Sequence, residues 1–246
     1  MIMLTKTQMN LLSFPLPDLE MILVEGGTYR RGDENSEYEV ERPVQEVCIT
    51  SFHLSKFLIT QALYEVVMGE NPSYRKGKQR PVEKISWDDT KSFLEKLNQL
   101  DIVRETLEKQ GLIDYHFRLP SESEWEYAAG NGKYSQGCIY AGSDELKQVG
   151  WYDENSNSET KPVGLLQPNE LGLYDISGNI HEWCEDDWHD SYKDSPIDGS
   201  PWIDAPSRAY DRVIRGGTYF RSAIHCRPAS RIRVSPGTRS YNIGFR

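Results

Sequence analysis

Residues 117–129 read FRLPSESEWEYAA and contain a clear helix start signal. Ser121 stands just after Pro120, and Glu124 follows it three positions later. This spacing is the capping-box pattern, in which each side chain satisfies a free backbone N–H group at the start of a helix. The pattern therefore predicts a short capped helix over Glu122–Ala129, with large aromatic side chains as its anchors.

Two further helices have start signals on the amino-terminal side of this stretch. Thr60 can cap a helix that ends near Met68. Ser86 and Asp89 form a second capping-box pattern, followed by apolar residues that fall on one helical face. The first half of the chain is therefore expected to contain three helices.

The sequence changes character after residue 130, where Gly, Asn, Pro and Ser become frequent and no segment keeps a helical period. A bare loop of this length is unusual in a compact domain, so short strands should anchor it. The expected strands are Met21–Gly27 with a turn over Thr28–Gly32, Val44–Phe57, Gly172–Ile176, Arg212–Arg215 and Ile243–Arg246. A helical first half and a loop-dominated second half predict an α+β domain.

Charge is unevenly distributed along the chain. The net charge of −10 argues against non-specific nucleic-acid binding and against docking on an anionic membrane. Residues 207–246 nevertheless hold nine arginines, no lysine and a single acid, Asp211. Arginine without lysine is typical of planar, packed ion pairs, so these side chains are expected to pair with carboxylates of the same domain. The alternative is a patch for an anionic ligand.

The four cysteines, Cys48, Cys138, Cys184 and Cys226, are widely spaced and form no CxxC motif. They predict reduced thiols rather than a zinc site or a disulfide framework. No apolar run is long enough to span a membrane, and the first 14 residues are too short and interrupted for a secretory signal. A removed signal would leave export open, so the sequence assigns no compartment.

Several stretches together resemble the formylglycine-generating-enzyme family. They are VEGGTYR (24–30), FRLPSESEWEYAA (117–129), NELGLYDISGNIHEW (169–183), RGGTY (215–219) and GFR (244–246). The resemblance implies a C-type-lectin-like fold. It implies a single domain over residues 20–246, preceded by an extension over residues 1–19.

The resemblance also implies where a catalytic centre would lie. The enzymes of this family bind copper with two cysteines that follow the RGG motif. Aligned on RGG, these positions hold Arg221 and Cys226 in this chain. A guanidinium group cannot act as a thiolate ligand, so the chain is expected not to be an enzyme and to have no cofactor. The alternatives are a metal-dependent oxidase built around His181 and Cys226, or an accessory module of a larger kinase-linked or sulfatase-linked system.

The segment after RGG also resembles the variable proteins of diversity-generating retroelements, which share this fold. Their altered codons end in C, which excludes Lys, Glu, Gln, Met and Trp. Thirteen positions between residues 218 and 241 obey that restriction, and they would form a variable region that binds a partner, most simply a protein. They are Phe220, Arg221, Ser222, Ile224, His225, Ser230, Ile232, Arg233, Val234, Ser235, Thr238, Ser240 and Tyr241. The ordinary alternative is that the apolar members face inward as core.

The stretch HEWCEDDWH (181–189) combines carboxylates with two histidines, a composition that suits a metal site. Asn179 and Glu182 could offer oxygen ligands to calcium. The resemblance instead implies a structural hydrogen-bonding turn for Glu182 and Trp183. The expected function is therefore recognition of a partner without membrane insertion, and the sequence indicates no oligomeric state.

Overall fold

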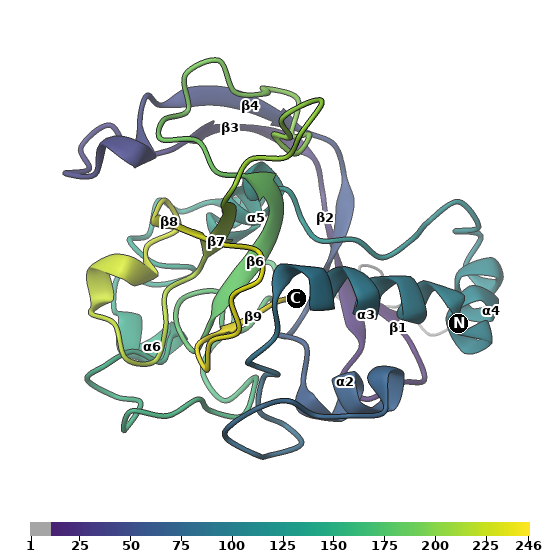
Figure 1. Ribbon diagram of the computed structural model, residues 1–246. Helices are drawn as coiled ribbons and strands as arrows, with labels where there is room; N and C mark the ends of the chain where they lie inside the picture. The colour runs from purple at the N-terminus through teal and green to yellow at the C-terminus, as the bar shows by residue number, and fades with distance from the viewer. Residues whose placement is uncertain (1–10) are drawn as a thin grey trace, which may run out of the picture.

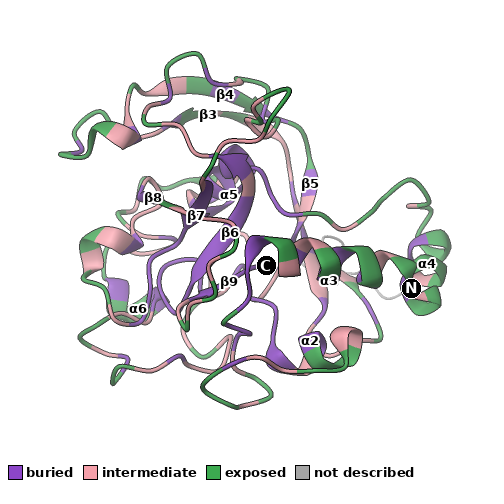
Figure 2. Ribbon diagram, viewed as in Figure 1, coloured by how far each residue is buried: buried purple, intermediate pink, exposed green. Residues whose placement is uncertain are grey.

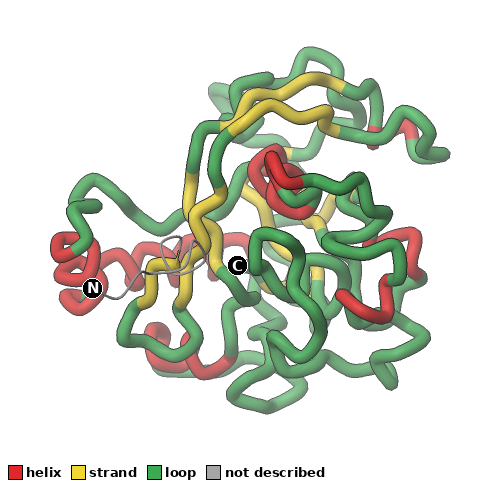
Figure 3. The backbone as a smooth tube through the Cα atoms, turned by 180° about the vertical axis from the view of Figure 1, so that it is seen from behind, coloured by secondary structure: helices red, strands yellow, loops and turns green. Residues whose placement is uncertain are grey.

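Short strands and short helices are joined by long loops over residues 11–246, the part of the chain that the computed structural model describes (Figure 1). The strands are β1 (Leu11–Ser13), β2 (Glu20–Val24), β3 (Gly27–Arg31), β4 (Gln45–Ile49), β5 (Phe52–Ser55), β6 (His181–Asp187), β7 (Arg212–Arg215), β8 (Arg231–Val234) and β9 (Ile243–Gly244). The helices are α2 (Gln61–Met68), α3 (Trp87–Gln99), α4 (Asp101–Lys109), α5 (Glu122–Ala129) and α6 (Leu146–Val149), with 3-10 turns η1 (Glu39–Glu41), η2 (Gly132–Tyr134) and η3 (Ala223–Cys226). The predicted α+β class is confirmed, and Figure 3 shows how much of the chain is loop.

The strands form three small sheets. β1, β2 and β5 make an antiparallel sheet, and β3 pairs with β4 in the hairpin that arches over the top of Figure 1. The central sheet has the order β8-β7-β6-β9, in which β9 runs parallel to β6. Since β6 and β7 are buried along almost their whole length, the residues at their ends are held in fixed positions.

The three helix starts predicted from the sequence are confirmed. Thr60 accepts a hydrogen bond from the backbone of Leu63 at the start of α2. Reciprocal capping boxes begin α3 and α5. The unpredicted α4 starts without a side-chain cap and is held by the buried Val103 and Leu107. Within residues 11–246, no helix is both long and apolar enough to cross a membrane.

The strand predictions succeed only in part. Arg212–Arg215 is a strand as predicted, and the strand predicted over Ile243–Arg246 ends at Gly244. The predicted turn after Gly27 is instead β3, whose backbone pairs with β4. The single strand predicted over Val44–Phe57 is two strands in different sheets.

Gly172–Ile176 is not a strand, because local contacts bend it. The side-chain oxygen of Asn169 accepts hydrogen bonds from the backbone of Leu171 and Leu173, both at 3.1 Å. Asp175 has a φ of 55°, which lies outside the extended region. The stretch is therefore a series of turns, while the actual central strand, β6, begins five residues later.

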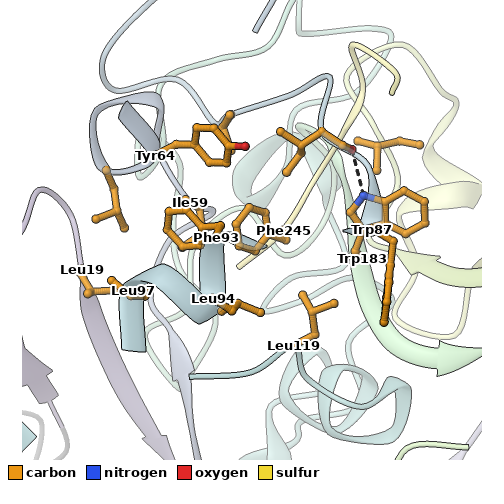
Figure 4. Packing of buried hydrophobic residues seen from close by; sticks show 14 of the residues in the cluster. Leu19, Ile59, Tyr64, Trp87, Phe93, Leu94, Leu97, Leu119, Trp183 and Phe245 are labelled. Atoms are coloured by element: carbon orange, nitrogen blue, oxygen red, sulfur yellow. Dashed lines mark hydrogen bonds between the residues drawn. The ribbon is translucent and has the colours of Figure 1, made fainter. Parts of the chain in front are cut away.

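The largest hydrophobic cluster lies between α3 and the central sheet (Figure 4). The ring of Phe93 stacks on Tyr64 at 5.4 Å between centroids and meets Phe245 edge to face at 5.2 Å. The indole N–H group of Trp183 donates to the carbonyl oxygen of Ile85 at 3.2 Å. Figure 2 shows the same central region as the buried part of the molecule. Motif residues such as Trp183 and Phe245 thus serve as core.

The predicted extension over residues 1–19 falls partly outside the described residues, which begin at Leu11. From there the chain pairs with β2 through β1, and Phe14 and Leu19 are buried in the main core. The domain boundary at residue 20 therefore stays a prediction, although residues 11–19 already pack against the sheet.

Candidate recognition surface

A buried ion pair joins the start of β6 to the end of the described chain. The guanidinium group of Arg246 donates to both oxygens of Glu182, at 2.7 and 2.8 Å, and both side chains are fully buried. The indole of Trp125 on α5 donates to the same carboxylate at 2.8 Å. Arg246 also donates to the carbonyl oxygens of Ser55 and Tyr174. Five parts of the fold therefore meet at this one ion pair.

A second buried network lies beneath α5. Arg231 on β8 donates twice to Glu122, both times at 2.7 Å, and Arg215 on β7 pairs with Glu126. Burial alone would raise the pKa of Glu122, but the charges of Arg231 and Arg215 hold that pKa below its usual value. This second network fixes β7 and β8, the strands on either side of the loop that connects them.

The arginines of residues 207–246 pair within the domain, as predicted. Eight of these nine arginines form ion pairs with carboxylates of residues 11–246, and Arg221 is the one of the nine that forms none with them. The pairs join Arg208 and Arg212 to Asp187, Arg215 to Glu126, Arg227 to Asp33 and Glu41, Arg231 to Glu122, Arg233 to Asp190, Arg239 to Asp89, and Arg246 to Glu182. This basic segment therefore connects parts of the structure through ion pairs.

The two positions that would hold the catalytic cysteines differ sharply. Arg221 is exposed, whereas Cys226 is buried. Burial raises the pKa of the Cys226 thiol to about 12, and burial lowers the pKa of His181 to about 3. At neutral pH, Cys226 is a thiol and His181 is a neutral, weakly basic imidazole. Within residues 11–246, no group of three or more His, Cys, Asp or Glu side chains could hold a metal ion.

We expect Cys226 to resist thiol reagents at pH 8 in the folded protein, because only the thiolate reacts and the thiol is buried. Its reaction with a disulfide reagent should be at least about a hundredfold slower than that of the exposed Cys48. Stopped-flow traces of the Cys48→Ser and Cys226→Ser variants assign each kinetic phase of the reaction to one of these cysteines. A fast phase that disappears in Cys226→Ser would contradict this assignment and favour the oxidase alternative.

The residues proposed for calcium are occupied by protein contacts. Both oxygens of Glu182 accept from Arg246, and the amide of Asn179 exchanges hydrogen bonds with the backbone of Lys161 at 3.0 and 3.1 Å. The stretch 181–189 is mainly β6, in which Glu182, Asp186 and Asp187 are buried. These contacts give no support to calcium at this pair, which remains an untested prediction.

The thirteen predicted variable positions divide into two groups. Arg221, Ser222, Ile224 and Tyr241 are exposed, and Phe220 is half-buried beside them. The ring of Phe220 lies 6.0 Å from that of Tyr241, and the guanidinium group of Arg221 lies 5.7 Å from the Phe220 ring centre. These five residues are called the aromatic surface below.

The other positions are placed differently. Ser230 is buried, and Ile232 and Val234 pack against the main core. Arg233 is exposed but faces Asp190 and Asp211. The remaining positions are half-buried, namely His225, whose ring lies 6.3 Å from Tyr38, and Ser235, Thr238 and Ser240. The alternative in which the apolar members face inward thus holds for Ile232 and Val234 of β8. The residues of the aromatic surface face solvent instead.

Backbone hydrogen bonds anchor the loops that carry the aromatic surface. The amide of Tyr219 donates to the carbonyl oxygen of Asn179 at 2.9 Å. The amide of Asp153 donates to the carbonyl oxygen of Arg221 at 3.2 Å. The amide of Lys84 donates to the carbonyl oxygen of Ser240 at 2.9 Å. These bonds involve no side chain of the aromatic surface, so a change of side chain there leaves the anchors intact.

A separate apolar cavity of about 300 Å³ lies among β2, β5, α3 and the loop before α5. Its lining includes Phe52, Phe93, Leu97 and Phe117, and none of the thirteen positions. The cavity is therefore distinct from the aromatic surface.

Comparison with protein families matches residues 13–246 to the "Sulfatase-modifying factor enzyme 1-like domain". The chaperone protein LppX of Paenibacillus barcinonensis is 33% identical over 77% of this chain and 81% of its own length. The formylglycine-generating enzyme of Streptomyces coelicolor is 32% identical over 68% of this chain. The chain spans 51% of that enzyme and only 38% of the serine/threonine-protein kinase Pkn1 of Chlamydia trachomatis.

Among solved structures, variable protein 1 of Treponema denticola superimposes with a TM-score of 0.81. The match covers 96% of each chain at 27% sequence identity. The formylglycine-generating-enzyme type of fold predicted from the sequence motifs is thereby confirmed over almost the entire chain.

Proposed function

The chain belongs to the family of sulfatase-modifying factor enzyme 1-like domains, and from that premise we propose that it is a non-catalytic recognition domain. The aromatic surface would bind the partner, most simply a protein. The similarity to a structure named variable protein supports this proposal, as does the low-reactivity environment of Cys226 and His181. We also propose that the thirteen positions over residues 218–241 form the diversified region.

The observation that carries the proposal is the placement of exposed aromatic and apolar side chains on an anchored backbone. Tyr241 is 51% exposed and Ile224 is 44% exposed, and Phe220 connects Tyr241 to Arg221. Clustered tyrosine, phenylalanine and arginine side chains are typical of binding hot spots. Because the backbone is already ordered, binding would lose little free energy to ordering these loops.

The test is to sequence the 3′ end of this gene and its flanking DNA in many sibling isolates. We expect substitutions confined to the codons of the thirteen positions, together with a nearby near-copy that carries AAC codons. The half-exposed and exposed positions should vary most, because side-chain changes there cost little stability. An invariant segment without a near-copy would refute diversification. The chain would then be a member of its family without a diversified region.

A metal-dependent oxidase is the second candidate, because the chain is 32% identical to a formylglycine-generating enzyme over 68% of its length. The arginine at position 221 opposes this candidate, since it leaves a single cysteine where copper needs two ligands. Stoichiometric copper binding that is lost in Cys226→Ser would favour the oxidase. An accessory role in a larger assembly would instead appear as co-purification with the product of a neighbouring gene.

A further inference from the structure

A basic loop borders the aromatic surface, although the protein as a whole is acidic. Residues 71–84, here called the basic loop, contain five cationic side chains and one acid, Glu83, in a chain of net charge −10. Glu83 is fully buried. The cationic residues are Arg75, Lys76, Lys78, Arg80 and Lys84, and all except the half-buried Arg80 are exposed. The solvent-facing side of this loop is therefore strongly positive.

Hydrogen bonds connect the basic loop to the segments that carry the aromatic surface. Lys84 bonds through its amide to Ser240, the residue before Tyr241. The guanidinium group of Arg75 donates to the carbonyl oxygen of Ser158 at 3.2 Å. Ser158 belongs to the loop whose Ser156 hydroxyl donates to the carbonyl oxygen of Tyr219. Lys84 thus contacts the loop that carries Tyr241 directly, and Arg75 is connected to the loop that carries Phe220 through the segment at Ser156 and Ser158.

A polar hollow lies within the basic loop. Tyr74, Arg75, Lys76, Arg80 and Glu159 line an open space of about 410 Å³. The carboxylate of Glu159 pairs with Arg80 at 3.3 Å, with Arg75 at 3.7 Å and with Lys161 at 2.9 Å, so a single negative charge is shared among three cations. Tyr74, at the rim, is 71% exposed. The hollow combines surplus positive charge with an exposed aromatic ring.

Negative charge also borders the aromatic surface. Asp153, whose amide bonds to Arg221, and its neighbour Glu154 are both exposed. A polyanion that covered the whole surface, such as a nucleic acid, would meet these two carboxylates. A protein segment with separate charged and apolar residues can place its carboxylates on the basic loop and away from Asp153 and Glu154, since complementary charge determines orientation at an interface.

We infer that the aromatic surface and the basic loop together recognise an acidic protein segment, in which carboxylate side chains lie beside an aromatic or large apolar residue. The carboxylates contact the basic loop, and the apolar residue contacts Phe220 and Tyr241. This inference rests on the proposed function and specifies its partner.

The experiment selects binders from a display library of random short peptides on the wild-type protein. The enriched peptides are then synthesised, and their affinities are measured by fluorescence anisotropy. We expect enrichment of Asp and Glu next to an aromatic residue. The charge-reversed variant Lys76→Glu/Lys84→Glu should weaken binding by about tenfold or more, and added salt should weaken wild-type binding.

A matched control uses Lys96→Glu/Lys193→Glu. Both of these lysines are exposed, lie outside the basic loop and form no ion pair within residues 11–246. This double variant carries the same change in net charge, so its affinity should stay within about twofold of wild type. Circular dichroism melts of both double variants verify that the fold is retained.

The outcomes separate this inference from the proposed function. Enrichment of neutral or basic peptides, or unchanged affinity in Lys76→Glu/Lys84→Glu, would overturn the acidic partner. If Phe220→Ala/Tyr241→Ala nevertheless abolished binding, the proposal that the aromatic surface binds the partner would still stand. A single-stranded DNA oligonucleotide that displaces the peptides and binds more tightly would replace the protein partner by a nucleic acid. The absence of any peptide that depends on Phe220 and Tyr241 would contradict both proposals.

Discussion

Replacing Arg246 by methionine is expected to lower the free energy of unfolding by about 3–5 kcal/mol. The substitution leaves the carboxylate of Glu182 fully buried, with the indole of Trp125 as its remaining side-chain donor. The carbonyl oxygens of Ser55 and Tyr174 also lose a donor. An unpaired buried charge costs far more than the pair contributes, because desolvation is no longer compensated by attraction.

Denaturant unfolding measures this effect, and Arg239→Met is the matched control. Arg239 makes a two-point contact with Asp89 of the same chemistry, but its side chain is 55% exposed. Removal of this surface pair should cost about 0–1 kcal/mol. The double variant Glu182→Gln/Arg246→Met should recover part of the loss, since no charge is then left buried. Equal losses for Arg246→Met and Arg239→Met would show that burial of the Glu182 pair is energetically unimportant.

Local signals made α2, α3 and α5 predictable from the sequence. Hydrogen bonds between residues three positions apart define the caps of α3 and α5, so the residue types alone indicate them. β7 was also predictable, because Arg212–Arg215 is bounded by a polar stretch and by the RGG glycines. Strands whose existence depends on a distant partner were not. β3 is extended because β4 lies beside it, and no residue in β3 encodes that pairing.

The same distinction explains the outcome for the candidate site. The sequence predicted ion pairs for the carboxyl-terminal arginines, since arginine without lysine is a compositional signal. It could not separate Tyr241 from Val234, because both satisfy the same codon restriction. The separation depends on β8 pairing with β7, which directs Ile232 and Val234 toward the main core. The basic loop also escaped notice, because its position beside the aromatic surface results from contacts between loops far apart in sequence.

Gly178 presents the second large expected effect, since it lies where two loops approach closely. Its φ is 95°, and a Cβ atom added there would lie 2.2 Å from the carbonyl oxygen of Trp151. That carbonyl accepts the amide of Asn179, and the carbonyl of Asn179 in turn accepts the amide of Tyr219. The substitution Gly178→Ala should therefore displace the backbone beneath Phe220. We expect a loss of about 3–5 kcal/mol from the clash and the unfavourable φ together.

Gly111→Ala isolates the contribution of the clash. Gly111 has a φ of 73°, but a Cβ atom added there would meet no other atom within 4 Å. Its replacement should cost only the conformational penalty, about 1–2 kcal/mol. Denaturant unfolding of the two variants gives the difference, and peptide binding should be weakened only in Gly178→Ala. If the two substitutions lowered the free energy of unfolding equally, the loop at Trp151 would move aside at no energetic cost. The aromatic surface would then lack the rigid support on which efficient recognition depends, because a loop that orders on binding loses affinity.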